Sequence, residues 1–114
     1  MLDTGPARLI AIAGSQAGRK FKIGDHAVIG RSSEASVTLE DPEVSRSHAR
    51  VSKSDLGAYL LEDLGSKNGT RVGPVVVTGP TPVRSGDEIH LGSAVVTIHA
   101  SASALTTETV ERPL

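Results

Sequence analysis

The sequence predicts an all-β fold, either a β-sandwich or a barrel. Short stretches of apolar or alternating residues recur about every ten residues, and turns containing Gly, Pro or Asp separate them. No stretch shows the spacing of three to four residues that is typical of a helix. The chain has 114 residues with one Phe, one Tyr and no Trp, so a single domain with an aliphatic core is expected.

Each expected strand rests on β-branched content or on period-two alternation. Phe21 and Ile23, for example, alternate with charged residues, which is the pattern of a half-buried strand. Gly79 to Pro82 is interpreted as a turn, because Pro and Gly interrupt strands. In chain order, nine to eleven strands are expected, at residues 8–13, 19–23, 26–29, 37–39, 49–52, 58–63, 70–77 with a break at Gly73 and Pro74, 87–91 entered from 83–86, and 94–98.

Composition also predicts the domain boundaries and the environment. Residues 1–7 are expected to be a disordered N-terminus, 8–99 the folded domain, and 100–114 a flexible tail or the start of a linker, since Ala, Ser and Thr dominate there. The net charge of −1 creates no general attraction for nucleic acid or anionic lipid. With no Cys, no apolar run near the ~20 residues of a membrane span and no signal segment, a cytoplasmic protein is expected.

Three loops between expected strands carry polar residues beyond those that a turn requires: Gly30-Arg31, Ser45-Arg46-Ser47-His48 and Ser66-Lys67-Asn68-Gly69-Thr70. In an antiparallel sandwich, loops separated by an even number of strands emerge at the same edge. This rule brings the second and third loops together. Only one expected strand separates the first loop from the second, so the rule alone does not bring Arg31 to the same edge.

If the three loops meet, their side chains suit a small dianion on an extended backbone. Arg31, Arg46 and Lys67 would supply positive charge, and Ser45 a hydroxyl donor. Phosphate has three acceptor oxygens, and a guanidinium can meet two of them at once. Asn68 could both donate to and accept from a peptide backbone, which a free phosphate would not require.

The ordered set Gly30-Arg31, Ser45 to His48, Asn68-Gly69-Thr70, Gly86-Asp87 and Leu91-Gly92 resembles the signature of the forkhead-associated (FHA) domain family. The resemblance extends over residues of about 8–99. It implies a β-sandwich of about eleven strands in two antiparallel or mixed sheets, which binds phosphothreonine peptides through loops at one edge.

The resemblance also implies roles for individual residues. Arg31 and Ser45 match phosphate-binding positions, and Arg46 and Lys67 match positions that contact phosphate or peptide. Asn68 matches the residue that holds the peptide backbone. Structural support of the loops is implied for Gly30, His48, Gly69 and Thr70. Lys67 stands where the family often has Thr, and Val72-Gly73-Pro74 replaces an Asn-Gly turn, so partner preference is the property that these departures affect.

Each of the candidate ligand-binding residues also has an ordinary structural interpretation. Arg31 could be an exposed arginine at a strand end, Ser45 could cap a turn, and Asn68-Gly69 is a hairpin-turn signal. The side chains of Arg46 and Lys67 could simply be solvated.

Two other functions are alternatives. A small hydrolase could use Ser45 and His48, with Asp63 completing a triad, but Ser45 lacks the glycine pattern of a nucleophile elbow. A phosphodiester or nucleic-acid binder would need a broad basic face and aromatic residues, which make up only 2% of this chain. The histidines show no short zinc-ligand spacing. We therefore expect no catalysis, no metal and no cofactor.

The expected partner is a phosphothreonine-containing protein or peptide, together with a Ser/Thr protein kinase or its substrates, and neither nucleic acid nor membrane. Thr106, Thr107 and Thr109 lie beside Glu108 in the expected tail and are candidate phosphoacceptors. If a kinase modified them, the domain could bind its own tail. An inert linker is the commoner role of such a segment.

Overall fold

The computed structural model describes residues 7–54 and 58–100 and contains eleven strands in these residues. Their bounds are β1 Ala7–Ala13, β2 Lys20–Ile23, β3 His26–Gly30, β4 Val37–Thr38, β5 Ala49–Lys53, β6 Tyr59–Asp63, β7 Thr70–Val72, β8 Val75–Val76, β9 Thr81–Val83, β10 Glu88–Leu91 and β11 Ala94–His99. The described part of the chain has no helix that is long and apolar enough to cross a membrane.

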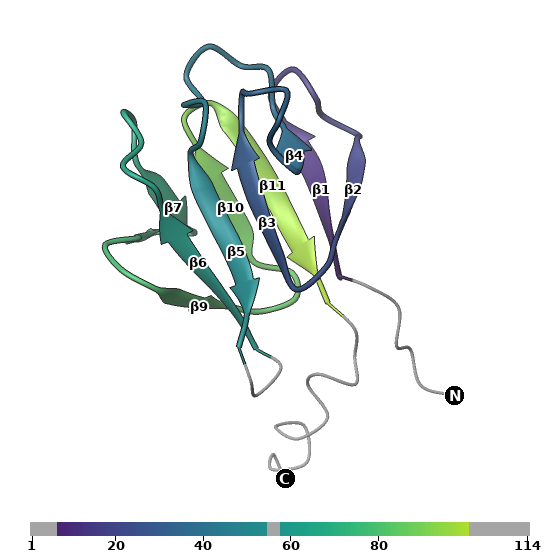
Figure 1. Ribbon diagram of the computed structural model, residues 1–114, viewed down its shortest axis with the longest axis vertical. Helices are drawn as coiled ribbons and strands as arrows, with labels where there is room; N and C mark the ends of the chain where they lie inside the picture. Colours follow the sequence, from purple (N-terminus) through teal and green to yellow (C-terminus); the bar gives the residue numbers. More distant parts are fainter. Residues whose placement is uncertain (1–6, 55–57, 101–114) are drawn as a thin grey trace, which may run out of the picture.

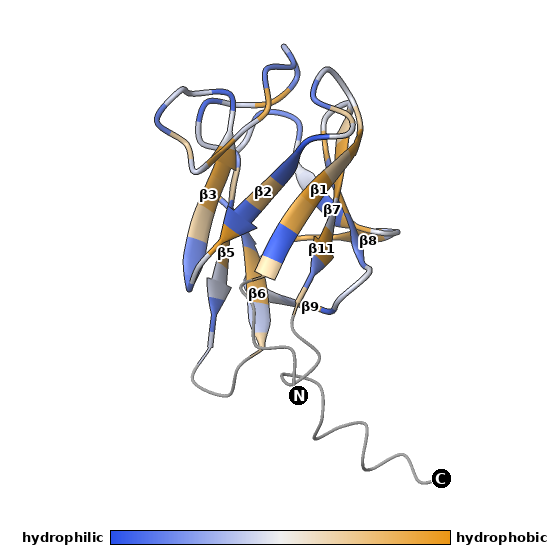
Figure 2. Cartoon of the chain, turned by 90° about the vertical axis from the view of Figure 1, so that its right-hand side faces the viewer, coloured by the Kyte–Doolittle hydropathy of each residue, from blue (hydrophilic) through white to orange (hydrophobic). Residues whose placement is uncertain are grey.

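The strands form two sheets that pack face to face, as the sequence predicts. One sheet has six strands in the order β2-β1-β11-β10-β7-β8, and the other has five in the order β4-β3-β5-β6-β9. Figure 2 shows the two layers, with β3 and β5 in one and β1, β7 and β11 in the other. The fold is therefore a β-sandwich rather than a closed barrel.

An aliphatic core fills the space between the sheets. Buried and more exposed residues alternate along β1 and β11, so that Leu9, Val96 and Ile98 point inward. Ile29 and Leu61 are fully buried on the facing sheet. Each such side chain stabilises the fold by about 1.5–3 kcal/mol relative to an exposed one. Phe21 packs only at the margin, which agrees with the aliphatic core that the composition predicts.

One expected turn is instead a strand. The sequence predicts a turn at residues 79–82, because Pro and Gly interrupt strands, yet β9 covers Thr81–Val83 and pairs with β6. Pro82 is tolerated because β9 lies at the edge of its sheet, so the N–H that proline lacks has no neighbouring strand to bond. The expected break at Gly73 and Pro74 is confirmed, as the turn between β7 and β8.

A parallel pair of strands decides where the polar loops emerge. β3 and β4 run parallel, with Ile29 opposite Val37 and Gly30 opposite Thr38. β3 and β5 are antiparallel, as are β5 and β6. Because β4 repeats the direction of β3, the loops after β3, β4 and β6 all emerge at one edge, the upper end in Figure 1. The antiparallel rule failed for Arg31 because it did not allow for this parallel pair.

Candidate functional site

Arg31 is fixed against the neighbouring loop by both its backbone and its side chain. Its backbone N–H donates to the Ser45 carbonyl oxygen at 2.9 Å. Its side-chain Nε donates to the Val44 carbonyl oxygen, also at 2.9 Å. Within the described residues, neither terminal guanidinium nitrogen has a recorded hydrogen-bond or ion-pair partner. The exposed guanidinium is thus held in place with its two outer donors available.

Gly30 permits this close packing of the two loops. It is buried at the end of β3, and a Cβ atom built on it would lie 1.9 Å from the Arg46 carbonyl oxygen and 2.7 Å from the carbonyl carbon. The Ser32 backbone N–H donates to the same oxygen at 3.3 Å. Only a residue without a side chain leaves room for the loop backbone at this place.

Two hydrogen bonds join the Ser45 loop to the loop between β6 and β7. The Lys67 backbone N–H donates to Ser45 Oγ at 3.0 Å. Asn68 Nδ2 donates to the Glu43 carbonyl oxygen at 2.8 Å. Because Ser45 Oγ accepts the Lys67 bond, its own proton is free to be donated to a ligand. The Asn68 amide oxygen likewise has no recorded partner among the described residues.

His48 joins the same two loops from beneath. It is completely buried. Its Nδ1 accepts from the Ser45 backbone N–H at 3.0 Å, which places the ring proton on Nε2. Nε2 then donates to the Gly69 carbonyl oxygen at 2.8 Å. Gly69 itself has a φ of +84°, a backbone conformation that favours glycine.

Asp63, at the end of β6, organises the third loop. Its carboxylate accepts from the Ser66 hydroxyl at 2.5 Å, from the Thr70 hydroxyl at 2.6 Å, and from the Ser66 and Gly65 backbone N–H groups at 2.9 and 3.0 Å. Burial alone would raise the pKa of Asp63, but these four bonds outweigh it and lower the pKa below its usual value. Thr70, which is almost fully buried, thus anchors the loop to the sheet.

Arg46 and Lys67 add positive charge at the rim. Both residues are exposed, and neither side chain has a recorded ion pair within the described residues. Together with Arg31, they place three cations on the joined loops. The same loops carry the carboxylates of Glu34, Glu40 and Glu43, so the three cations act as individual donors and not as a broad positive surface.

The geometry does not support a hydrolase triad. His48 bonds the Ser45 backbone rather than its hydroxyl, and its second ring nitrogen is occupied by Gly69. The Asp63 carboxylate bonds Ser66 and Thr70 instead of His48. No base is therefore placed to activate Ser45. In the described ranges, no cluster of three or more His, Cys, Asp or Glu residues is arranged to hold a metal ion.

Sequence reasoning missed the groups that position the site. The backbone carbonyl groups of Glu43 and Val44 orient Asn68 and Arg31. Backbone acceptors leave no trace in residue type, so no sequence signal could have identified them. The sequence suggested only a triad role for Asp63, although an Asp placed two residues before Gly65 and three before Ser66 is a recognisable Asx-turn signal. The candidate phosphoacceptors Thr106, Thr107 and Thr109 lie outside the described residues, so modification of the tail stays a prediction.

Comparisons with known proteins agree with this geometry. FhaB of Mycolicibacterium smegmatis is 34% identical over 90 residues, which cover 78% of this chain and 57% of FhaB. The chain thus spans little more than half of that relative's length. A solved FHA domain from work on phosphothreonine-dependent FHA interactions is 32% identical, with a TM-score of 0.73, covering 82% of this chain and 94% of that one.

A second solved structure is Mycobacterium tuberculosis EmbR in complex with a low-affinity phosphopeptide. It is 26% identical with a TM-score of 0.75, and the match covers 85% of this chain and 25% of EmbR. The family described as the FHA domain matches residues 27–92, which include every loop residue discussed above. More than half of the chain fits this family, and the chain therefore belongs to the FHA domain family.

Proposed function

We propose that this FHA domain binds proteins phosphorylated on threonine and thereby recruits targets of Ser/Thr kinases. The observation that carries the proposal is the joining of three loops, from different strands, into one edge with unpaired donors. Arg31 and Asn68 each use one side-chain nitrogen to fix the loops and leave other polar atoms for a ligand. Ser45 Oγ accepts the bond from Lys67 and keeps its own proton for a ligand. The similar domains described with phosphothreonine-dependent interactions and with a bound phosphopeptide support the same function.

Phosphate capture follows from the donors that remain. The outer guanidinium nitrogens of Arg31 donate to two phosphate oxygens, and the Ser45 hydroxyl donates to a phosphate oxygen. Each of these charge-assisted bonds contributes about 1.5–3 kcal/mol. Arg46 and Lys67 strengthen the attraction at the rim. Because the loops are already joined, little ordering is needed on binding, which favours affinity.

Recognition of the peptide depends on Asn68. Its amide nitrogen is held by the Glu43 carbonyl oxygen, so the amide oxygen is oriented to accept an N–H from a bound peptide backbone. Inorganic phosphate offers no such group. The site therefore favours phosphate carried on a polypeptide, and it performs no reaction on it.

A phosphothreonine peptide library, read by calorimetry, tests this function. We expect binding that disappears when the same peptide is treated with phosphatase. Arg31→Ala should lose nearly all affinity, because the phosphate loses its two-donor partner, whereas Arg8→Ala, on an exposed strand position, is the matched control. A library without any phosphate-dependent binder would overturn the proposal, and full affinity in Arg31→Ala would overturn the site.

A further inference from the structure

β2 is an edge strand of the six-stranded sheet. It pairs with β1 and with no other described strand, at the end of the sheet opposite β7 and β8. Figure 1 shows β2 on the right of the described chain, with no strand of that sheet beyond it. In an antiparallel pair, every second residue directs its backbone N–H and C=O away from its partner. β2 therefore has backbone donors and acceptors available to a further strand, at the opposite end of the sheet from the strand that follows the Asn68 loop.

The side chains of β2 alternate between the two faces of the sheet. Lys20 and Lys22 are exposed on the outer face, whereas Ile23 is buried and Phe21 packs at the margin of the core. The two lysines are separated by one residue, so their Cα atoms lie about 6.6 Å apart along the strand. A second strand beside β2 would have the same spacing between its own alternate side chains, and would bring two of them next to the two ammonium groups.

No carboxylate balances these lysines within the described residues. Neither Lys20 nor Lys22 has a recorded ion pair or side-chain hydrogen bond there, and Arg8 has none either. Lys22 is directly opposite Arg8 of β1, and like charges in such a cross-strand pair destabilise a sheet. Glu40 accepts at 3.4 Å from Gln16, in the turn between β1 and β2, and not from a lysine. The outer face at β2 thus carries positive charge that a carboxylate from another molecule can offset.

The inner side of the same edge carries an aromatic ring that the core covers only in part. Phe21, the one phenylalanine of the chain, is half-buried. The Arg19 guanidinium carbon lies 5.5 Å from the centroid of its ring. An apolar side chain on a neighbouring strand would gain contact area against Phe21 and remove apolar surface from water.

Lysines on an edge strand commonly prevent two copies of a protein from pairing, because they repel each other. An acidic strand has the opposite charge, and the same lysines attract it. Backbone hydrogen bonds then supply affinity, and the alternate side chains supply specificity, as in other cases of strand addition. The two roles are compatible, since one pair of lysines both excludes a second copy and selects an acidic segment.

We propose that β2 binds an extended acidic segment of a partner protein as an added strand. Asp or Glu at two alternate positions pairs with Lys20 and Lys22, and the apolar residue between them packs against Phe21. The free backbone groups, the charge of the face and its period of two residues all fit this chemistry. The surface goes beyond the phosphothreonine function, because it needs no phosphate and uses none of the loop residues that hold one.

The test is an NMR titration of the ¹⁵N-labelled domain with unphosphorylated peptides. One peptide has two Glu residues flanking one Val between Gly-Ser segments, and its counterpart has Gln in place of both Glu. We expect the Glu peptide to shift the amide signals of Lys20–Ile23 and to bind about 5-fold more tightly than the Gln peptide. Added salt should reduce this difference, because the lysines are exposed. N-methylation of the Glu-Val-Glu backbone should abolish the shifts, because it removes the N–H groups that pair with β2.

Variants of the domain assign the preference to the two lysines. Lys20→Gln combined with Lys22→Gln should bind the Glu and Gln peptides equally. Lys53→Gln combined with Arg84→Gln is the matched control, since it removes the same charge from exposed positions outside the six-stranded sheet, and it should retain the preference. The peptide changes leave the domain unaltered, so they decide the matter even if a variant does not fold.

Several results would overturn the proposal. Among them are equal binding of the two peptides to the unchanged domain, a Glu preference that survives in the double lysine variant, and shifts confined to Arg31, Ser45 and Lys67. Undiminished binding of the N-methylated peptide would indicate charge attraction without an added strand. Concentration-dependent shifts of β2 without peptide would assign the edge to a second copy. Shifts caused by phosphatidylserine vesicles but not by the Glu peptide would assign it to a lipid surface. None of these results bears on the phosphothreonine function.

Discussion

At the scale of single residues, His48 and Asp63 act on the ligand only through the loops that they hold. His48 bonds one loop through each ring nitrogen, because Nδ1 accepts from the Ser45 backbone N–H and Nε2 donates to the Gly69 carbonyl oxygen. Asp63 accepts three hydrogen bonds from the loop between β6 and β7 and a fourth from Thr70, the first residue of β7. Neither side chain is placed to touch phosphate, yet the positions of Ser45 and Asn68 depend on them.

In the Asp63→Asn variant, the free energy of unfolding should change less across the acid pH range than it does in the unchanged domain. The folded-state pKa of Asp63 lies below its unfolded value of about 3.9, so the ionised carboxylate stabilises the fold above that pH, and this contribution is lost as the pH falls through the folded pKa. Replacement by Asn should therefore cost about 1–3 kcal/mol at pH 7 and progressively less below pH ~4. Urea denaturation at several pH values measures this. If the variant and the unchanged domain differed in unfolding free energy by the same amount at pH 7 and at pH ~2.5, the role of Asp63 would be contradicted.

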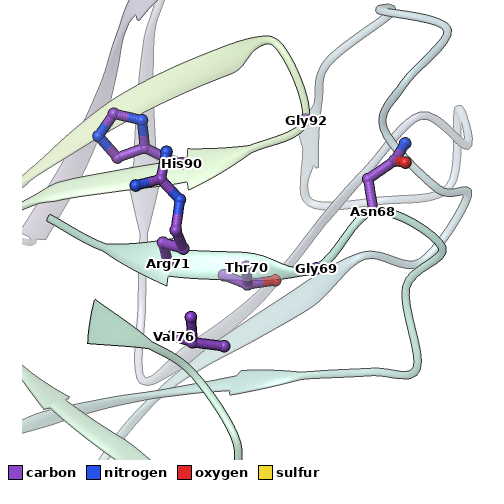
Figure 3. A pocket seen from close by; sticks show the side chains of 7 residues that line it. All are labelled: Asn68, Gly69, Thr70, Arg71, Val76, His90 and Gly92. Atoms are coloured by element: carbon purple, nitrogen blue, oxygen red, sulfur yellow. The ribbon is translucent and has the colours of Figure 1, made fainter. Parts of the chain in front are cut away.

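Residue types that carry charged, hydroxyl or amide groups could be predicted from the sequence as site candidates. Arg31, Ser45, Lys67 and Asn68 are such residues, and the structure brings their loops together. The groups that orient them could not be predicted, because carbonyl oxygens such as that of Val44 belong to every residue alike. The pocket that Arg71 and His90 line beside Asn68 (Figure 3) could not be predicted either, because it forms only when β7 and β10 pair.

At the scale of elements, the two-residue strand β4 determines at which edge of the sandwich the Arg31 loop emerges. Its parallel pairing with β3 brings the Arg31 loop to the edge that already carries the Ser45 loop. Strand positions could be predicted from alternation, but pairing direction could not, because alternation is the same in parallel and antiparallel pairs at a sheet edge. The short strand β9 was missed for a related reason, since edge position, which makes Pro82 acceptable, is not visible in local sequence.

Gly30→Ala tests the packing between β3 and the Ser45 loop. The added methyl group would overlap the Arg46 carbonyl group, so the loop must move away from β3. We expect a loss of about 1–3 kcal/mol in unfolding free energy, and at least a 10-fold loss of phosphopeptide affinity, because Ser45 moves with the loop. Gly24→Ala is the control, since a Cβ atom there meets nothing within 4 Å, and it should change stability by no more than about 0.5 kcal/mol. Equal behaviour of the two variants would refute the packing argument.

At the scale of the whole molecule, the sandwich couples stability to recognition. The aliphatic core between the sheets extends into the loop between β4 and β5, where Leu39 and Val44 are fully buried, and the same loop carries Ser45 and Arg46. The fold class followed directly from strand spacing and composition. The convergence of the loops did not, because it depends on tertiary pairing that brings together residues as distant in sequence as Arg31 and Asn68.

The central claim is that three joined loops form a single phosphothreonine site. The most direct measurement is an NMR titration of the ¹⁵N-labelled protein with a phosphothreonine peptide and with its unphosphorylated form. We predict that the phosphorylated peptide shifts the amide signals of Arg31, Ser45 and Lys67, that β2 residues Lys20–Ile23 are unaffected, and that the unphosphorylated peptide shifts none of them. Phosphate-dependent shifts that spare these three loops, and fall on another part of the domain, would contradict the account.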